Sequence, residues 1–473
     1  MRFKLLALSL LLPLFFWGCV PKITTQQTLK ISQLNQALDD ENFTRSDGML
    51  RVEWWKSYND EQLNEIIKFA RSENPSIKSI EARYALANSI INAVQASKLP
   101  SVFADAAISR QRFSENYIFP PPLGGGTETL YQLGVGLSYD FDFWDAKEFK
   151  LLSAKYSAMA EKAYIEETKL ILASAISKIY VKWNFDQKRI QKYDQLILVL
   201  NEKKKLFRYQ YNQGLRDILE LNQIDIEITK TQRDIQKIKR LIEGEKESIC
   251  ILAGYLPSKA KQFRDPHIIE NVKMAVPNEI YLNLLAHRAD ISVQKYTVLS
   301  KAQQIDLAKT AFYPNISLSA MAGFVSFDLD KFLGHSSFAP SSGVAFSLPL
   351  FDGGARKANL ELHVSDYNSS VYAYDSIVIK AANEVVATLK KSQYIDNEIS
   401  LHVNESKLIE KNRELTQKRF SAGITNKVPL FQVKMQEIDS RLTTLMLLED
   451  KNLLNIELIQ ALGGGYVDNN ETK

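Results

Sequence analysis

Hydrophobic positions alternate with polar or small ones along residues 131–143, the stretch YQLGVGLSYDFDF. Because successive side chains of a strand point to opposite faces, this pattern predicts a strand with one apolar face. Residues 343–351, GVAFSLPLF, repeat the pattern, and 101–110 and 315–325 are weaker versions of it. Strands of ~10 residues that alternate in this way are typical of outer-membrane barrels. A sheet covering a soluble core alternates equally well, but aromatic residues at the strand ends favour lipid.

A second pattern fills the rest of the chain, in stretches without glycine or proline. The two longest are 145–213 and 355–422, both rich in helix-forming residues with apolar positions at helical spacing. At 1.5 Å per residue each predicted helix is ~100 Å long, so the helices must pack lengthwise as coiled coils. Shorter stretches of the same kind accompany them: 76–99, 215–243, 278–313 and 430–462.

The order of these elements occurs twice. Residues 74–100 align without gaps on 288–314, DFDFWDA corresponds to SLPLFDG, and RYQYNQG corresponds to QKRFSAG. Landmarks repeated in one order indicate an internal duplication. We expect a signal peptide (1–18), an N-terminal segment (19–60), a first repeat (61–257), a linker (258–278), a second repeat (279–466) and a tail (467–473).

Four strands are too few to close a barrel, and open sheet edges are not tolerated in lipid. Closure therefore requires several chains, and three copies would supply twelve strands. After the N-terminus no stretch approaches the ~20 uninterrupted apolar residues of a membrane helix. We therefore expect strands, if any part of the mature chain crosses a membrane.

The N-terminus has the composition of an export signal. Arg2 and Lys4 precede an apolar run that ends in Gly18-Cys19, and the run is too short to span a membrane. A cysteine after a small residue at this place resembles a bacterial lipobox, in which the thiol is acylated and the chain is cut before it. We therefore predict that Cys19 is lipidated and that palmitate is among its acyl chains. A plain signal peptide with an incidental cysteine is the alternative.

Composition excludes several classes of function. A formal net charge of +4 over 473 residues is far below the strong positive charge typical of nucleic-acid-binding proteins. The five histidines form no metal-binding spacing, and neither a phosphate-binding loop nor a serine nucleophile motif occurs. Cys250, the other cysteine, is predicted to be a buried thiol. We expect no enzymatic activity, no metal and no cofactor beyond the lipid on Cys19.

The ordered set of motifs resembles the TolC-like outer-membrane efflux channels, in particular their lipoprotein (NodT-type) branch. The resemblance rests on EWWKSYNDEQLNEIIKFARSENPSI (53–77), SKLPSVFADAAIS (97–109), YQLGVGLSYDFDFWDAK (131–147) and LPLFDGGARKANLE (348–361). It implies a mixed α/β membrane protein, a homotrimer with an α-barrel of long helices and a shared twelve-stranded transmembrane β-barrel. It also implies partners: a periplasmic adaptor and an inner-membrane transporter of the RND type.

The function that the resemblance implies is an outer-membrane exit duct that passes drugs or other small toxic solutes and so contributes to antibiotic resistance. The protein would be lipid-anchored in the outer membrane and would extend into the periplasm. The alternative within this class is the channel of a type I protein secretion system. A periplasmic adaptor lipoprotein is the alternative of another class, but an adaptor needs one helical hairpin, and this chain has two.

Gly214 and Gly423 end the two longest helices and mark the expected periplasmic tips, because glycine adopts the left-handed helix cap readily. In the family, acidic residues six or nine positions past the second glycine often close the aperture; here those positions hold Pro429 and Gln432. Residues near both turns are therefore our gate candidates, with solvated turn residues as the alternative. The candidates are Tyr211, Arg216, Asp217, Glu220, Phe420, Asn426, Lys427 and Gln432.

Overall fold

The computed structural model describes residues 24–26, 52–116, 118–270, 272 and 287–468. These residues belong to two compact units, and each unit takes segments from both sequence repeats. The expected lipidation site, Cys19, lies outside the described residues. The first unit contains the sheet, and the second contains the two hairpin turns.

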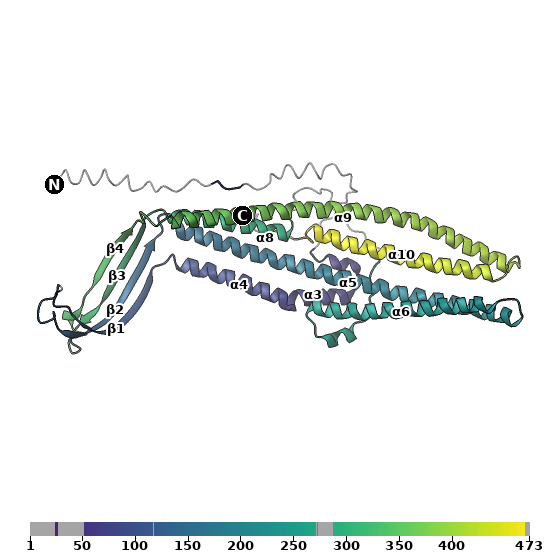
Figure 1. Ribbon diagram of the computed structural model, residues 1–473, viewed down its shortest axis with the longest axis horizontal. Coiled ribbons are helices and arrows are strands. Elements are labelled where there is room, and N and C mark those ends of the chain that lie inside the picture. Colours follow the sequence, from purple (N-terminus) through teal and green to yellow (C-terminus); the bar gives the residue numbers. More distant parts are fainter. Residues whose placement is uncertain (1–23, 27–51, 117, 271, 273–286, 469–473) are drawn as a thin grey trace. The chain divides into compact units, whose positions relative to one another are not determined.

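The first unit holds one antiparallel sheet of four strands in the order β1-β2-β3-β4 (Figure 1). The strands are β1 (Ser101–Arg112), β2 (Thr127–Phe141), β3 (Asn315–Ser326) and β4 (Ser341–Ser347). The central pair, β2 and β3, comes from different halves of the chain. The duplication therefore places one hairpin from each repeat in a single sheet.

The strand bounds differ from the sequence expectation by a few residues, most at the end of β4 and the start of β2. The fourth strand was expected to run to residue 351, but β4 ends at Ser347. Pro349 follows, and proline has no amide hydrogen for a strand ladder, which accounts for the early end. The second strand begins at Thr127, before the alternating stretch, because 127–130 pair with the end of β1.

Two helices of 67 residues each dominate the chain, α5 (Ala146–Asn212) and α9 (Ala355–Ser421). The stretch without glycine predicts a helix that ends at residue 243, but helix α6 (Ile218–Ala253) continues through Gly244. A glycine inside a helix lowers its stability but does not end it. No helix within the described ranges is long and apolar enough to cross a membrane. The remaining helices are α3 (Glu61–Glu73), α4 (Pro75–Ala96), α6 (Ile218–Ala253), α8 (Ala289–Thr310), α10 (Val428–Ala461), and the short 3-10 turns η2 (Trp54–Tyr58), η3 (Pro257–Gln262) and η4 (His335–Ser337).

The core of the second unit includes the segment before residue 61. Trp54 and Tyr58 are 5% and 2% exposed and pack with side chains of α3, α5 and α6. Asp60 caps α3 by accepting from the Leu63 amide at 3.0 Å, and it also accepts from the Tyr180 hydroxyl at 2.9 Å. The expected boundary at residues 60 and 61 therefore falls inside one packed core.

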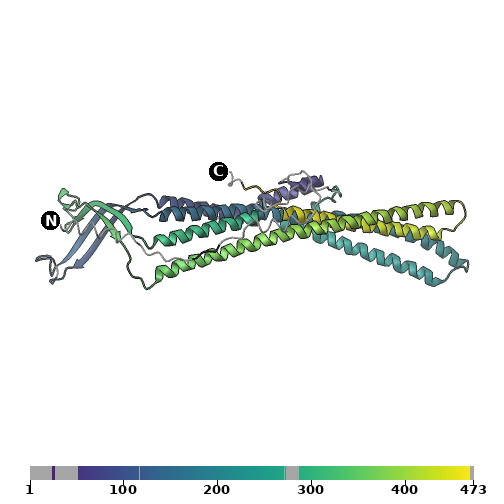
Figure 2. The same ribbon diagram turned by 90° about the horizontal axis from the view of Figure 1, so that it is seen from above.

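Four helices of the second unit lie side by side in the order α6, α5, α10, α9. Helices α5 and α6 share a cluster that includes Leu200 and Leu221. Arg189 on α5 forms an ion pair with Glu449 on α10. His402 on α9 donates from Nε2 to the Ser440 carbonyl of α10 at 2.9 Å. The turns after α5 and α9 lie at the same end of the unit in both views (Figures 1 and 2).

A carboxyl group in this layer is held neutral at neutral pH. Burial raises the pKa of Glu245 on α6 to about 8, and the nearby carboxylates of Asp186 and Glu449 add to the rise. Lys182 and Arg189 oppose it, and Arg189 is already paired with Asp186 and Glu449. Ionisation of Glu245 is therefore unfavourable in the folded chain.

The substitution Glu245→Gln tests this arrangement. Because the folded-state pKa is raised, the native carboxyl lowers stability progressively as pH rises from about 4.5 to about 8. We expect the unfolding temperature of the variant to exceed that of the wild type by a few degrees at roughly pH 9, with little difference near pH 5. The control is Glu243→Gln, which removes an exposed carboxylate on the same helix. Parallel pH scans for wild type and Glu245→Gln would contradict the assignment.

Candidate functional site

One face of the sheet is almost wholly apolar. The register pairs Ile108 with Tyr131, Val135 with Ala322, and Ile316 with Phe346, and cross-strand partners share a face. Several of these side chains are open to the surroundings: Ile108, Val135, Val344 and Phe346 are 74%, 53%, 69% and 60% exposed. An apolar face of this extent on a soluble monomer would be unusual, so it marks a surface that contacts lipid or another chain.

The opposite face carries small and polar residues, with Asp105 level with Gly134 and Ser138 level with Ser319. Two larger side chains pack on this face. A Cβ added at Gly136 would lie 2.4 Å from Cζ of Phe103, and one at Gly134 would lie 2.5 Å from Cε of Met321. The glycines thus leave room for an aromatic ring and a methionine on a face that the sequence pattern describes as small or polar only.

Aromatic side chains gather at both ends of the sheet. At the end where β2 joins α5, the ring centroids of Trp144 and Tyr313 stack at 4.8 Å, and Trp144 donates to the Pro314 carbonyl at 2.7 Å. At the far end, the ring centroid of Phe113 lies 4.9 Å from that of Phe119 and 5.8 Å from that of Phe327. Two aromatic clusters on either side of an apolar band are the pattern of a strand segment that spans a bilayer.

The two helical hairpins turn in the same way. Gly214 and Gly423 have φ of +70° and +72°, a region that side-chain-bearing residues avoid. After α5, the Leu215 amide donates to the Gln210 carbonyl at 2.9 Å; after α9, the Ile424 amide donates to the Arg419 carbonyl, also at 2.9 Å. Both are six-to-one bonds of the Schellman motif, which fixes where each helix ends.

In the first turn, charged side chains make contacts within the α5–α6 hairpin. Arg216 forms an ion pair with Glu220, donates to the Gln210 side chain at 2.6 Å, and lies with Cζ 3.6 Å from the ring centroid of Phe207. Asp217 is the N-cap of α6 and accepts from the Leu219 amide at 3.0 Å. Asp217 therefore stabilises the first turn of α6.

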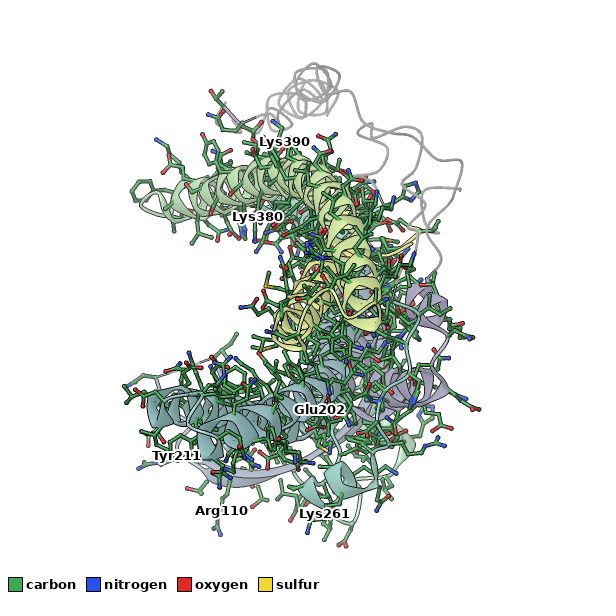
Figure 3. All side chains as sticks on the ribbon, turned by 90° about the vertical axis from the view of Figure 1, so that its right-hand side faces the viewer. Arg110, Glu202, Tyr211, Lys261, Lys380 and Lys390 are labelled. Atoms are coloured by element: carbon green, nitrogen blue, oxygen red, sulfur yellow. The ribbon has the colours of Figure 1, made fainter. Side chains whose placement is uncertain are left out.

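In the second turn, Lys427 reaches the other hairpin. Its Nζ lies 3.6 Å from Oε2 of Glu202 on α5, and 5.4 Å from the ring centroid of Phe431, which is 1% exposed. Asn426 accepts from the Val428 amide at 3.0 Å. In Figure 3, Glu202 lies on the α5 side of the helical layer together with Tyr211. The ion pair thus links the two turns within one copy of the chain.

The remaining gate candidates sit on the surface of the turns. Tyr211 is 41% exposed, Gln432 is exposed, and Phe420 is half-buried. Sequence reasoning missed Glu202 and Phe207, because their partners are set by how the helices pack. Glu202 in particular lies far along the chain from Lys427, and no local spacing connects them. The role of all these residues in gating stays a prediction.

No group of histidine, cysteine, aspartate and glutamate side chains suited to a metal ion occurs among the described residues. Cys250, expected to be a buried thiol, is 2% exposed, and burial raises its pKa.

Comparison with known families identifies the chain. The model of the family described as outer membrane efflux protein matches residues 66–246 and 280–464, one segment for each repeat. The chain belongs to the outer membrane efflux protein family. The resemblance to the outer-membrane efflux channels is therefore confirmed, and the family matches both halves of the duplication; the lipoprotein branch stays a prediction.

Curated relatives match over nearly the whole length. The multidrug resistance outer membrane protein MdtQ of Escherichia coli O157:H7 is 26% identical over 469 residues, covering 95% of either chain. The protein MdtP of Escherichia coli strain K12 is 25% identical over 451 residues, covering 93% of this efflux family member and 91% of MdtP.

Solved structures share the fold. The outer membrane protein VceC of Vibrio cholerae has a TM-score of 0.79 at 24% identity, covering 88% of this chain and all of VceC. The CmeC outer membrane channel of Campylobacter jejuni has a TM-score of 0.81 at 19% identity, covering 95% and 96%. The expected fold of one chain, long paired helices with four antiparallel strands, is confirmed.

The pair between Lys427 and Glu202 can be tested in the channel. An exposed pair contributes under ~1 kcal/mol, but symmetry would repeat it in each copy. We expect Lys427→Glu to raise single-channel conductance in planar bilayers, since two carboxylates would then repel each other. The exchange Glu202→Lys with Lys427→Glu should restore the wild-type value. Leu137→Val, in β2, is the control that should leave conductance unchanged. If Lys427→Glu conducts like the wild type, closure rests on packing instead.

Proposed function

We propose that this protein is the outer-membrane exit duct of a tripartite efflux pump. The observation that carries the proposal is the sheet: an apolar band between two aromatic clusters, on four strands that have two open edges. Such a sheet fits lipid only when other copies close it. Three copies would give a twelve-stranded barrel, and the paired helices would continue it as a tunnel through the periplasm.

The proposed partners follow from this architecture. A passive duct performs no chemistry, so an inner-membrane transporter of the RND type supplies the energy and a periplasmic adaptor connects the two. The names of MdtQ and MdtP refer to multidrug resistance, which supports small toxic solutes as cargo. Protein secretion by a type I system is the second candidate, because a passive lumen does not itself select the solute.

Deleting the gene distinguishes the two cargoes. We expect the deletion strain to accumulate a fluorescent cationic dye faster than its parent, and a plasmid copy of the gene to restore efflux. Secreted protein should stay at the parental level, because the duct would serve the drug pump. Normal dye accumulation together with loss of a secreted protein would overturn the choice of cargo.

We also propose that Cys19 carries a lipid that tethers the mature N-terminus to the membrane. We expect Cys19→Ser to remove the acyl mass and leave the assembled channel in the membrane, because the strands anchor it independently. Mass spectrometry of the mature N-terminus checks the first point and membrane fractionation the second. A wild-type mature chain that begins at another, unmodified residue would contradict the lipid.

A further inference from the structure

The outer edges of the helical layer carry exposed side chains that none of the described residues covers. On α9, Tyr394, Leu401, Leu408 and Leu415 recur every seventh residue and are 75%, 71%, 65% and 49% exposed. A seven-residue apolar repeat keeps one stripe of a helix turned toward a partner helix. The side of α9 that faces α10 is a different one, since the buried residue His402 marks it. The stripe therefore fits a contact that the described residues of one copy do not supply.

Helix α6, at the other edge, presents a matching surface. Its buried residues, among them Leu221, Ile224 and Ile228, face α5. On the opposite side Leu219 and Ile226 are 68% and 58% exposed, and Lys230, Arg233, Lys237 and Arg240 are exposed beyond them. This edge is apolar near the turn and cationic farther from it.

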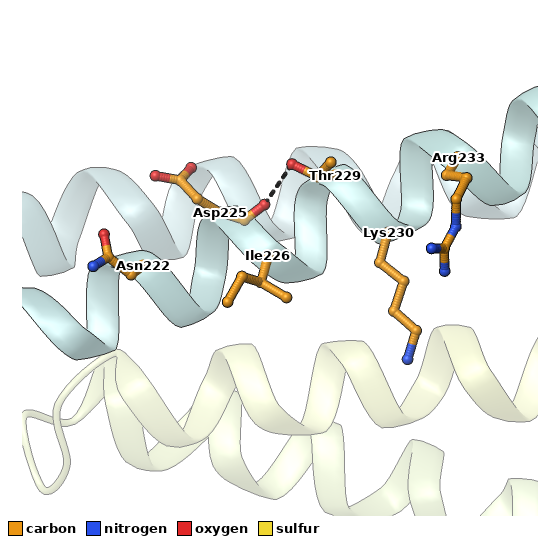
Figure 4. Close-up of a pocket in the computed structure, with 6 residues that line it drawn as sticks. All are labelled: Asn222, Asp225, Ile226, Thr229, Lys230 and Arg233. Carbon is orange, nitrogen blue, oxygen red and sulfur yellow. Dashed lines mark hydrogen bonds between the residues drawn. The ribbon is translucent and has the colours of Figure 1, made fainter.

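The α6 edge is also hollowed. A depression of about 520 Å³ lies along it, lined by Asn222, Asp225, Ile226, Thr229, Lys230 and Arg233. In Figure 4, Ile226, Lys230 and Arg233 project to the same side of the helix. The exposed face of α6 thus has room for side chains of an adjoining helix.

Opposite charges on the two edges lie at equal distances from the hairpin turns. Helix α6 runs away from its turn and α9 runs toward its own, so positions can be counted from Gly214 and Gly423. At 1.5 Å per residue, Arg233 on α6 and Glu405 on α9 both lie about 28 Å from their turns. By the same count Arg240 and Glu398 both lie about 38 Å away. Two acidic positions seven residues apart therefore lie level with two cationic positions seven residues apart.

We propose that α9 of one copy packs against α6 of the next copy, with Glu405 paired to Arg233 and Glu398 to Arg240. This α6–α9 contact rests on the proposed assembly of three copies and specifies its register. Charged residues that flank an apolar stripe set the pairing and alignment of coiled-coil helices in the same way. Among the described residues Arg233, Arg240 and Glu398 have no ion pair, while Glu405 lies 3.0 Å from Nδ1 of His402.

The geometry of the layer selects a second copy as the occupant. The edges α6 and α9 differ from each other, so head-to-tail contact between copies joins unlike surfaces, and such a contact forms a ring when the rotation between copies closes. Every copy then buries both of its edges. An adaptor helix would need its own acidic or cationic pattern at the same depth, whereas the chain already supplies both patterns at matching distances from its turns.

Disulfide trapping tests the register in the full-length channel. In a Cys250→Ser background, Lys237→Cys and Leu401→Cys lie at about 34 Å and 33 Å from the turns and should link neighbouring copies. We expect a ladder up to trimer on non-reducing gels. The matched control combines Leu401→Cys with Gln223→Cys, which lies only about 14 Å from its turn and should give no ladder. Each single cysteine serves as a background for adventitious links.

The outcomes separate this inference from the proposed function. A ladder only with the level pair supports the α6–α9 contact. An intact wild-type trimer, seen as heat-modifiable migration, without a ladder from the level pair overturns the contact and leaves the assembly standing. A wild type that forms no trimer overturns the assembly, and the contact with it.

A charge exchange tests the two ion pairs themselves. We expect Glu398→Lys with Glu405→Lys to lower the temperature at which the trimer dissociates in detergent. Adding Arg233→Glu and Arg240→Glu should restore it, because the pairs are re-formed with reversed sign. The loss of the His402 contact cannot be repaired from α6, so restoration identifies the pairs across copies. A quadruple variant no more stable than the double variant would overturn the pairing.

Discussion

An unpaired strand edge is the constraint on which the rest of this structure depends. The strands β1 and β4 are the outermost strands of the sheet, so each leaves a row of backbone amides and carbonyls on its outer side. In hydrocarbon no water can satisfy those groups, and each unsatisfied one costs several kcal/mol. If this sheet lies in lipid, as we propose, other copies must pair with its two open edges and close it into a wall. The helical layer repeats the situation, with α6 and α9 as its edges.

The duplication explains how one chain builds both layers. Each repeat supplies one strand hairpin and one helical hairpin, and the two helical turns close with the same Schellman bonding around Gly214 and Gly423. Equal helices of 67 residues before each turn bring the turns to one end of the second unit. Positions along the layer can therefore be counted from each turn, so a charged residue at a given distance from one turn can be compared with a residue at the same distance from the other.

Much of this fold could be read from the sequence because its two periods are so distinct. Strict alternation located the strands, and the absence of glycine and proline located the long helices. The failures were local: Pro349 shortens β4, and Gly244 does not interrupt α6. Pairs such as Lys427 with Glu202 could not be predicted from the sequence, because they depend on which helix faces pack together. The role of Asp217 as a helix cap could be predicted from its position directly before α6, because aspartate is a preferred N-cap residue.

The proposed contact between copies also bears on where the tunnel can open. If Arg233 and Glu405 are paired, α6 and the neighbouring α9 are joined from about 28 Å behind the turns onward. Closer to the turns the edges carry Leu219, Ile226 and Leu415, which can slide against each other without leaving a charge unpaired. The exposed pair of Lys427 with Glu202 lies in this outer part and is weak individually. Opening would therefore be confined to the last turns of each hairpin, while the paired charges behind them hold the wall together.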